Sequence, residues 1–262
     1  MNNMKRTALI TGASGGLGVE FARIHASKGD DLVLVARSKA KMDQLKIELE
    51  NEFAVSVCVN AIDLSVTSAL QLIYDELKSQ HIHIDYLINN AGFGDFGLFA
   101  ECDWERQLEM INLNIAALAG LTRLFLPEMI RSGFGKILNI ASTAAFQPGP
   151  TMSMYFATKA FVLSFSEAIA NELKGTGVTV TALCPGATET GFKSAAALGK
   201  SNLFKGNGIA RSKDVAEFGY KAMMKGKTVV VQGFLNLLMA ESVRFAPRNL
   251  VTVIARLKLK EQ

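Results

Sequence analysis

The sequence predicts an α/β fold in which seven parallel strands form a doubly wound sheet with helices on both faces. Short, almost continuously apolar runs alternate with amphipathic stretches along the whole chain, which is typical of strands buried on both faces. The first apolar run ends in a cluster of glycines. No Ser/Gly/Pro-rich linker and no repeat divides the 262 residues, so we predict one domain over residues 1–262.

The predicted strands are short runs rich in Val, Ile and Leu, residues that favour a pleated, buried surface. They span residues 7–11, 31–37, 55–63, 84–92, 136–142, 178–186 and 228–232.

Helical spacing of apolar residues follows each strand except the last. The predicted helices span residues 17–29, 38–53, 66–80, a long stretch ending at Pro127, 153–173 and 212–225. Residues 190–211 are rich in Gly, Ala, Ser and Lys and have no clear pattern, so we expect a loop there. Residues 234–262 predict a C-terminal extension of two amphipathic helices broken at Pro247.

Composition and charge exclude several classes of protein. The chain is 49% hydrophobic and 20% charged, which is typical of a globular protein. Its net charge is +4, and its 28 basic and 24 acidic residues are scattered without a dense Lys/Arg block, which argues against nucleic-acid binding. The cysteines, Cys58, Cys102 and Cys184, form no CxxC pair, and His81 and His83 lack a third ligand nearby, so we expect neither disulfides nor a metal. No signal-like apolar segment opens the sequence, and we expect a cytoplasmic protein.

The turn after the first strand reads ITGASGGLG and carries Gly12, Gly15, Gly16 and Gly18. Glycines between a strand and a helix let the backbone approach a pyrophosphate, and the helix N-terminus supplies unpaired N–H groups. The spacing is not GxGxxG, so an ordinary glycine-rich turn is the alternative. We favour nucleotide binding because the turn follows the first strand.

The end of the second strand indicates which dinucleotide would bind. An NAD-binding fold usually has a carboxylate there, but this sequence has Ala36 followed by Arg37. An arginine beside a small residue suits a 2′-phosphate. We therefore predict NADP(H); the alternative is that Arg37 and Lys39 are only solvated residues at a helix start.

Tyr155 and Lys159 lie four residues apart in a largely apolar helix, which places them on one face. An ammonium near a phenol favours the phenolate, so we expect the Tyr155 pKa to be lowered toward neutral pH. Ser142 follows the fifth strand and lies at the edge of the sheet where parallel folds bind ligands.

Together these features resemble the short-chain dehydrogenase/reductase family in its compact form. The resemblance covers residues 5–231 and includes TGASGGLG, Asp63–Leu64, NNAG at 89–92, Ser142, YFATK at 155–159 and PGATET at 185–190. YxxxK alone is weak, but the set in this order is specific. Gly12, Gly15 and Gly18 also fit the TGxxGxxG loop of the longer epimerase and dehydratase relatives, whereas NNAG favours the compact form. The resemblance implies a Rossmann-like fold.

The family's catalytic roles can be carried over residue by residue. Tyr155 would be the acid/base, Lys159 would bind the nicotinamide ribose and lower the phenol pKa, and Ser142 would hold the substrate carbonyl. The Asn that carries a proton-relay water matches Asn114, with Asn112 as the less favoured alternative.

The resemblance also implies the cofactor contacts. The pyrophosphate would lie on the glycine turn, the 2′-phosphate on Arg37, the adenine near Asp63, its ribose near 90–92 and the carboxamide near the PGATET threonines. The full set is Gly12, Ser14, Gly16, Leu17, Gly18, Arg37, Asp63, Asn90, Ala91, Gly92, Tyr155, Lys159, Pro185, Gly186, Thr188 and Thr190. Residues 190–211 would be the substrate loop.

Apolar residues surround the predicted centre and favour a hydrophobic substrate. They are Phe93, Phe96, Phe99, Ala144, Ala145, Phe146, Met152, Met154 and Phe192. The three Phe residues nearest NNAG could equally be core residues. For the basic C-terminal tail we consider, in this order, a lid over the substrate, an oligomer contact and a membrane-surface helix. A homodimer or homotetramer is the family's usual assembly.

We therefore expect an NADP(H)-dependent oxidoreductase that interconverts a carbonyl and a primary or secondary alcohol, with a small-molecule substrate and no nucleic acid. The alternative is a non-catalytic NADP(H)-binding regulatory or partner protein that retains the fold. A complete Asn–Ser–Tyr–Lys set favours the enzyme, because a binding module needs no acid/base phenol.

Overall fold

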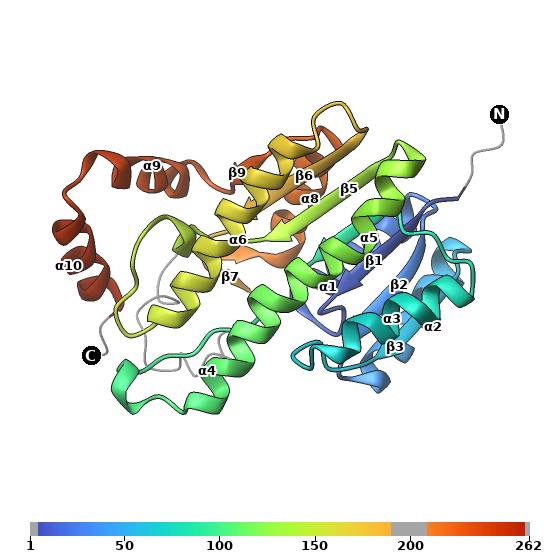
Figure 1. Ribbon diagram of the computed structural model, residues 1–262, viewed down its shortest axis with the longest axis horizontal. Helices are drawn as coiled ribbons and strands as arrows, with labels where there is room; N and C mark the ends of the chain where they lie inside the picture. The colour runs from blue at the N-terminus through green and yellow to red at the C-terminus, as the bar shows by residue number, and fades with distance from the viewer. Residues whose placement is uncertain (1–4, 190–208, 260–262) are drawn as a thin grey trace.

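Seven parallel strands form the sheet at the centre of the computed structural model, which describes residues 5–189 and 209–259 (Figure 1). Their order is β3-β2-β1-β4-β5-β6-β9. The strands are β1 Thr7–Thr11, β2 Asp31–Ala36, β3 Val57–Ala61, β4 Tyr86–Asn89, β5 Gly135–Ile140, β6 Val178–Cys184 and β9 Val229–Val231. The predicted seven-stranded, Rossmann-like sheet is confirmed.

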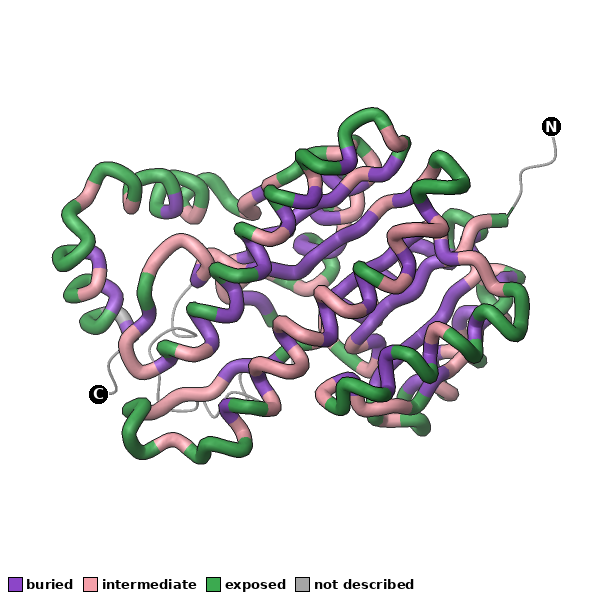
Figure 2. The backbone as a smooth tube through the Cα atoms, viewed as in Figure 1, coloured by how far each residue is buried: buried purple, intermediate pink, exposed green. Residues whose placement is uncertain are grey.

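The strands are buried on both faces, as their apolar runs predict (Figure 2). In β1, Ala8 and Ile10 pack into one core cluster and Leu9 into another. Successive side chains of a strand point to opposite faces, so an unbroken apolar run fills both cores at once.

Helices cover both faces of the sheet. Residues of α1, α2 and α8 pack on one face, and residues of α3, α5 and α6 pack on the other. The helices are α1 Gly16–Ser27, α2 Lys39–Phe53, α3 Ser68–Ser79, α4 Trp104–Ile111, α5 Leu118–Ser132, α6 Ser153–Glu172, α8 Ser212–Met224, α9 Phe234–Ser242 and α10 Arg248–Leu259. Short turns of helix are η1 Phe99–Glu101, η2 Asn112–Ala117, η3 Thr143–Phe146 and η6 Val243–Phe245.

All the predicted strands except the first run one to three residues past the observed carboxyl ends, and two further expectations about elements are wrong. Helix α5 continues through Pro127 to Ser132 and ends at Gly133, whose φ is 67°. Phe125 and Met129 on either side of the proline are buried against the sheet, and this packing holds the helix although Pro127 donates no hydrogen bond.

The second concerns residues 190–211, for which we expected only a loop. There, β8 Ala210–Arg211 pairs in parallel with β7 Thr188–Glu189 in a small second sheet. Residues 190–208 of the predicted substrate loop lie outside the described residues.

One helical stretch among the described residues, Trp104–Ser132, is long and apolar enough to cross a membrane by length and composition. It consists of α4, η2 and α5, and it packs on the sheet through residues that include Leu121, Phe125 and Met129. A buried core helix passes the same test, and the packing accounts for its apolar character.

Strand order fixes where a ligand can bind. Strand β1 lies between β2 and β4, so the chain leaves β1 toward one edge of the sheet and later returns to add strands on its other side. Loops diverge at such a switch point and leave a crevice at the carboxyl ends of the strands. The glycine turn follows β1 and NNAG follows β4, so both motifs lie at this crevice.

Candidate active site

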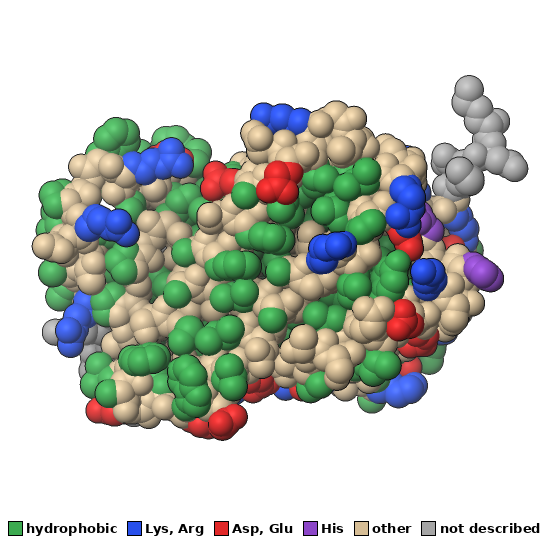
Figure 3. Space-filling view, in the orientation of Figure 1, with side chains coloured by type: hydrophobic (Ala, Val, Ile, Leu, Met, Phe, Trp, Pro, Cys, Tyr) green, Lys and Arg blue, Asp and Glu red, His purple; other side chains and the backbone are tan. Residues whose placement is uncertain are grey.

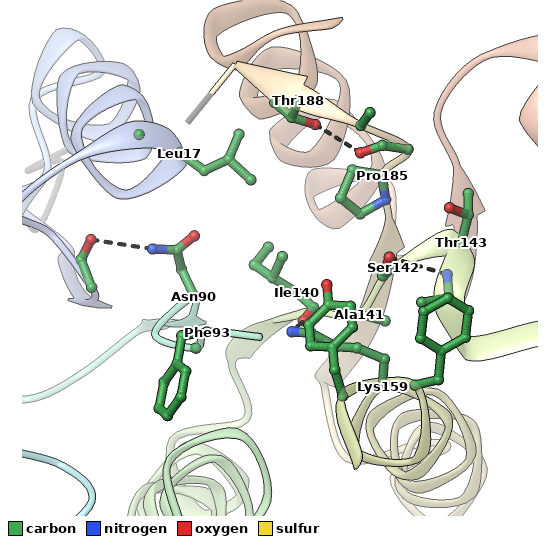
Figure 4. Close-up of a pocket in the computed structure, with 18 of the residues that line it drawn as sticks. Leu17, Asn90, Phe93, Ile140, Ala141, Ser142, Thr143, Lys159, Pro185 and Thr188 are labelled. Atoms are coloured by element: carbon green, nitrogen blue, oxygen red, sulfur yellow. Dashed lines mark hydrogen bonds between the residues drawn. The ribbon is translucent and has the colours of Figure 1, made fainter. Parts of the chain in front are cut away.

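A cavity of about 830 Å³ lies at this edge of the sheet. Its wall is built from the ends of β1, β2, β4, β5 and β6, from the start of α6 and from the inner side of α9 and α10. Figure 4 shows Leu17 and Asn90 on one side of the cavity, with Ser142 and Thr143 on the other. Most of the predicted cofactor and catalytic residues therefore line one cavity, with Gly18 and Asn114 as exceptions among the described residues.

The glycine turn is shaped by close backbone packing. A Cβ on Gly12, whose φ is 67°, would lie 2.8 Å from Asn90 Nδ2. A Cβ on Gly18 would lie 2.2 Å from the carbonyl oxygen of Gly12. Gly18 does not line the cavity. It lies beneath the turn and allows helix α1 to pack against it, so its contribution to the predicted pyrophosphate contact is indirect.

Gly15 is different, because a Cβ there would meet nothing within 4 Å. Gly15 precedes α1 and makes no side-chain cap, so the first N–H groups of the helix are left for a ligand. Ser14, Gly16 and Leu17 line the cavity beside it. Uncapped donors at the positive end of a helix dipole fit a pyrophosphate, and the residues present therefore suit a dinucleotide.

Thr11 ties the glycine turn to NNAG, a function the sequence analysis missed. Its hydroxyl accepts hydrogen bonds from the backbone N–H groups of Asn90 and Ala91, both at 2.9 Å. Asn90 in turn donates from Nδ2 to the carbonyl oxygen of Thr11 at 2.9 Å. Asn90, Ala91 and Gly92, the residues expected near the ribose, all line the cavity. The TG pair at 11–12 was the available signal, but we considered only its glycine.

Arg37 lies at the far end of the cavity, where β2 ends. Its guanidinium Nη1 lies 3.2 Å from Glu109 Oε1 and 3.8 Å from Asp63 Oδ2, and 69% of the side chain is exposed. Ser38 and Lys41 line the same part of the cavity, and the sequence analysis missed them. Lys39, the residue it considered, pairs with Asp43 instead.

Asp63 is held by its own turn. Its Oδ1 accepts from the Ser65 N–H at 2.9 Å and from the Ser65 hydroxyl at 2.7 Å. Partial burial raises the pKa of Asp63, but the two bonds from Ser65 and the Arg37 charge outweigh it, so the pKa lies below the ordinary value. The carboxylate is therefore a fixed hydrogen-bond acceptor at the cavity wall, where the adenine was expected.

Ser142 and Tyr155 meet on the opposite wall. The Ser142 hydroxyl is close enough to the Tyr155 phenol to lower its pKa. Ser142 Oγ accepts a hydrogen bond from the Ala144 N–H at 3.1 Å, and this bond caps η3 and fixes the serine rotamer. Two hydroxyl groups from different elements thus point at one place, where a substrate oxygen could accept from both.

Lys159 extends along the floor of the cavity (Figure 4). Its Nζ donates to the carbonyl oxygen of Ile140 at 2.7 Å and lies 5.8 Å from the centre of the Tyr155 ring. Burial lowers the Lys159 pKa to about 8. A Cβ on Gly92 would lie 2.9 Å from Asn114 Oδ1, so this glycine leaves room for the Asn114 side chain rather than for the ammonium.

The prediction of a lowered Tyr155 pKa is wrong. Burial raises the pKa of Tyr155 to about 12, and the nearby Ser142 hydroxyl offsets this only in part. The Lys159 ammonium donates its hydrogen bond to the Ile140 carbonyl, and burial lowers its own pKa. The desolvation of the phenol therefore raises the Tyr155 pKa more than the Lys159 charge lowers it.

Asn114 is buried in η2 and does not line the cavity. Its Oδ1 accepts from the Phe93 N–H at 3.1 Å, while its Nδ2 donates to the Phe93 carbonyl at 2.9 Å and to Thr158 Oγ1 at 3.0 Å. Asn114 therefore joins the segment after NNAG to α6 between Tyr155 and Lys159. Asn112, the alternative, is half-buried on the same turn.

The remaining predicted cofactor residues follow β6. Pro185, Gly186 and Thr188 line the cavity, and the Thr188 hydroxyl donates to the Gly186 carbonyl at 3.0 Å (Figure 4). Thr190 lies outside the described residues.

Apolar side chains form the wall beside Tyr155, which agrees with the expected hydrophobic site. Phe93, Ala144, Phe146 and Met152 line the cavity, whereas Phe99 is exposed and takes no part. Phe96, Ala145 and Met154 pack behind the wall, and Phe192 lies outside the described residues.

The C-terminal helices complete the wall. Residues of α9 and α10 that line the cavity include Asn236, Ala240, Val251 and Ala255, and Leu259 packs in one cluster with Tyr155. This position suits the lid that was our first interpretation of the tail.

A buried polar network behind the site also escaped the sequence analysis. Asn89 Nδ2 donates to Asn139 Oδ1 at 2.9 Å and to Thr122 Oγ1 at 3.1 Å, and Asn139 Nδ2 donates to Ser166 Oγ at 2.9 Å. It links β4 and β5 to α5 and α6. Asn89 belongs to NNAG, but its partners are polar residues in apolar segments that only the fold brings together.

The crevice and the uncapped helix end at the carboxyl edge of a parallel sheet are typical of the dinucleotide-binding class of α/β proteins. Residues 6–200 match the sequence profile described as short chain dehydrogenase, and the chain belongs to this oxidoreductase family.

Named relatives support the same family. The chain is 34% identical over 227 residues to the ketoacyl reductase HetN of Nostoc sp., covering 86% of this chain and 78% of that protein. It is 35% identical over 185 residues to the human very-long-chain 3-oxoacyl-CoA reductase, covering 68% of this chain but only 58% of that protein.

Solved structures agree in fold. A short-chain dehydrogenase from Sphingobium yanoikuyae in complex with NADPH superposes with a TM-score of 0.83 at 33% identity, covering 94% of each chain. A short chain dehydrogenase/reductase from Burkholderia phymatum in complex with NAD has a TM-score of 0.81 at 25% identity, covering 90% of this chain and 92% of that one. Both dinucleotides thus occur among similar structures.

Proposed function

We propose that the protein is an NADP(H)-dependent oxidoreductase that interconverts a carbonyl and a primary or secondary alcohol on a hydrophobic substrate. One observation carries the proposal: the Ser142 and Tyr155 hydroxyls lie near each other in the same cavity as the uncapped N-terminus of α1. The apolar wall and the ketoacyl reductases among the relatives support a hydrophobic carbonyl compound.

The glycine turn would hold the dinucleotide through Gly12, Ser14, Gly16 and Leu17. A bound nicotinamide supplies or accepts the hydride. Arg37, with Ser38 and Lys41 beside it, would receive a 2′-phosphate, because three donor groups of this kind suit an anion with several oxygens. The residues after β6, including Thr188 and Thr190, would bind the carboxamide.

Tyr155 would act as the acid in the reducing direction. A pKa of about 12 keeps the proton on the phenol at neutral pH, so the hydroxyl can donate it to a substrate oxygen. Ser142 would donate a hydrogen bond to the same oxygen and stabilise its developing charge. The Lys159 ammonium, 5.8 Å from the ring centre, would stabilise the phenolate that remains. In alcohol oxidation the phenolate takes the proton back.

The test of this chemistry is the Tyr155→Phe variant. NADPH oxidation would be followed by absorbance with a series of ketones, aldehydes and 3-oxoacyl thioesters. Loss of the acid should reduce the rate about 10²–10⁴-fold. NADPH binding, measured by fluorescence, should persist, which separates the enzyme from a binding-only protein. A variant that turns over at the normal rate would remove Tyr155 from the mechanism.

The choice of cofactor has its own test. Arg37→Ala should weaken NADPH binding on the order of 10–100-fold and leave NADH binding nearly unchanged, because the lost charged hydrogen bonds go to the 2′-phosphate. Lys39→Ala is the matched control: its side chain is also 69% exposed but does not line the cavity. Equal affinity of the wild type for NADH and NADPH would contradict the proposal.

We also propose a homodimer or homotetramer in the cytoplasm. Trp104, Leu108 and Phe161 are exposed apolar residues on α4 and α6, and burying them against a second copy would remove this surface from water. Light scattering should give a multiple of 28.3 kDa that falls in a Trp104→Ser, Phe161→Ser variant. A monomer at micromolar concentration would refute the assembly, and recovery in an extracellular fraction would refute the location.

A further inference from the structure

Helices α9 and α10, with η6 between them, form an arm over residues 234–259 at one end of the molecule, and Figure 1 shows that they extend beyond the sheet and its covering helices. The arm has an inner side, which lines the cavity, and an outer side toward solvent. Its outer side exposes large apolar residues that neither the packing of the domain nor the proposed reaction requires.

Helix α10 is apolar on two sides. Val251, Ala255 and Leu259 are buried, and their spacing places them on one stripe. A second set, Leu250, Val253, Ile254 and Leu257, has the spacing i, i+3, i+4 and i+7 and is 46–62% exposed. A helix that only packs on its own domain has one apolar stripe, so the second stripe indicates a further apolar neighbour.

The rest of the arm continues this surface. Phe234 is 78% exposed, Phe245 is 88% exposed, and Leu235 and Leu238 are exposed between them on α9. Bulky apolar residues this exposed, gathered on one arm, exceed the scattered single residues of an ordinary surface.

Charge distinguishes between possible neighbours. Residues 234–262 contain five basic and two acidic residues, so this segment carries +3 of the chain's net charge of +4. Figure 3 shows Lys and Arg side chains interspersed with the hydrophobic ones over the arm. Two copies of the same positive surface would repel each other, whereas an anionic surface would attract it.

We propose that the outer side of this arm docks on an anionic phospholipid membrane. Helices that lie in a membrane interface combine exposed Phe and Leu with Lys and Arg, and bind by apolar burial plus attraction to anionic lipids. Arg248 and Arg256 are exposed on α10 and are long enough to reach headgroups while the apolar stripe inserts.

The arm joins the membrane surface to the cavity. Ile254 lines the cavity and is 46% exposed, so the apolar outer stripe is continuous with the cavity wall. Docking would place this side of the cavity at the bilayer, where a hydrophobic compound is concentrated. The docking rests on the surface alone and stands even if the proposed reaction is wrong.

The test is co-sedimentation of the full chain with vesicles of phosphatidylcholine alone or mixed in equal parts with phosphatidylglycerol. The wild type should bind the anionic vesicles, with binding that weakens as salt is raised. Arg248→Gln with Arg256→Gln should weaken binding on the order of 30-fold. Leu238→Ser with Phe245→Ser should weaken it at least as much, because both apolar side chains would otherwise insert.

The matched control is Ile47→Ser with Leu72→Ser, which removes exposed apolar residues from α2 and α3 and should bind as the wild type does. Unchanged melting temperatures would show that all variants are folded. Neither Leu238 nor Phe245 lines the cavity, so turnover of a water-soluble substrate should be retained.

Three results would overturn the proposal. The wild type could fail to bind vesicles, it could bind neutral and anionic vesicles equally at low salt, or the control could lose binding as much as the arm variants. A fall in oligomer mass in the Leu238→Ser, Phe245→Ser variant, without vesicle binding by the wild type, would instead identify a second copy as the neighbour.

Discussion

Replacing Gly18 by alanine tests whether this glycine shapes the nucleotide turn. A Cβ there would lie 2.2 Å from the Gly12 carbonyl oxygen, 2.8 Å from the Gly12 carbonyl carbon and 2.9 Å from Ala13 Cα. All three are backbone atoms, so no side chain can rotate away. The helix and the turn must separate by about 1 Å to restore ordinary contact.

The expected loss of stability is the difference between two effects. Overpacking a tight contact costs about 1–3 kcal/mol. Alanine in place of glycine inside a helix returns up to about 1 kcal/mol. We expect a net loss of about 1–2 kcal/mol, or about 2–8 °C in melting temperature for a domain of this size.

Thermal unfolding followed by circular dichroism measures this effect. Gly15→Ser is the matched control in the same turn, because a Cβ at Gly15 meets nothing within 4 Å and serine is a preferred residue before a helix. The control should melt at or above the wild-type temperature. The reasoning is contradicted if Gly18→Ala melts at the wild-type temperature while Gly15→Ser melts at a lower one. In that case the close contact at Gly18 does not determine the stability of the turn.

Three further predictions follow from the site. Burial lowers the Lys159 pKa to about 8 from the reference value of 10.5, so between these pH values the unfolded chain binds one proton more than the folded chain. The unfolding free energy of the wild type, relative to that of Lys159→Met, should therefore rise by about 3 kcal/mol from pH 8 to 10.5 in urea titrations. A difference that stays flat or falls over this range would refute the burial of the amine. Asn139→Leu removes one of the two acceptors of Asn89 Nδ2 and should cost about 1–3 kcal/mol in the same assay, whereas a neutral effect would mean that the network is dispensable. Glu109→Gln frees Arg37 from its 3.2 Å partner and should tighten NADPH binding several-fold in fluorescence titrations; weaker binding would mean that Glu109 positions Arg37 instead.

Local sequence patterns predicted the sheet well because the signals are local. The apolar runs at 7–11 and 31–37 fill two cores through alternating side chains, and nothing distant is needed to recognise them. The end of α5 was missed because Pro127 stops a helix only when packing does not oppose it. Here Phe125 and Met129 bind the helix to the sheet on both sides of the proline.

Residues of the candidate site could be predicted from the sequence where a residue type at that place in the fold usually has a single role, such as glycine in the turn after the first strand. Gly12, Ser142 and Lys159, which were chosen from the sequence, all line one cavity, and their roles in it stay predictions. The pKa of Tyr155 was not predictable, because the spacing of Tyr155 and Lys159 gives their proximity but neither their burial nor the hydrogen bond from Lys159 to Ile140. Asn89 and Asn139 are 50 residues apart, and their pairing depends on strand order.

The arm also carries an evolutionary consequence. The match to the family profile ends at residue 200, so the helices that close the cavity beside Tyr155 lie outside the matched residues. Substitutions at Val251 or Ala255 would therefore change the shape of the cavity while the matched segment, with Ser142, Tyr155 and the glycine turn, keeps its sequence. Variation in the tail is thus a route to a different cavity that leaves the shared part of the fold untouched.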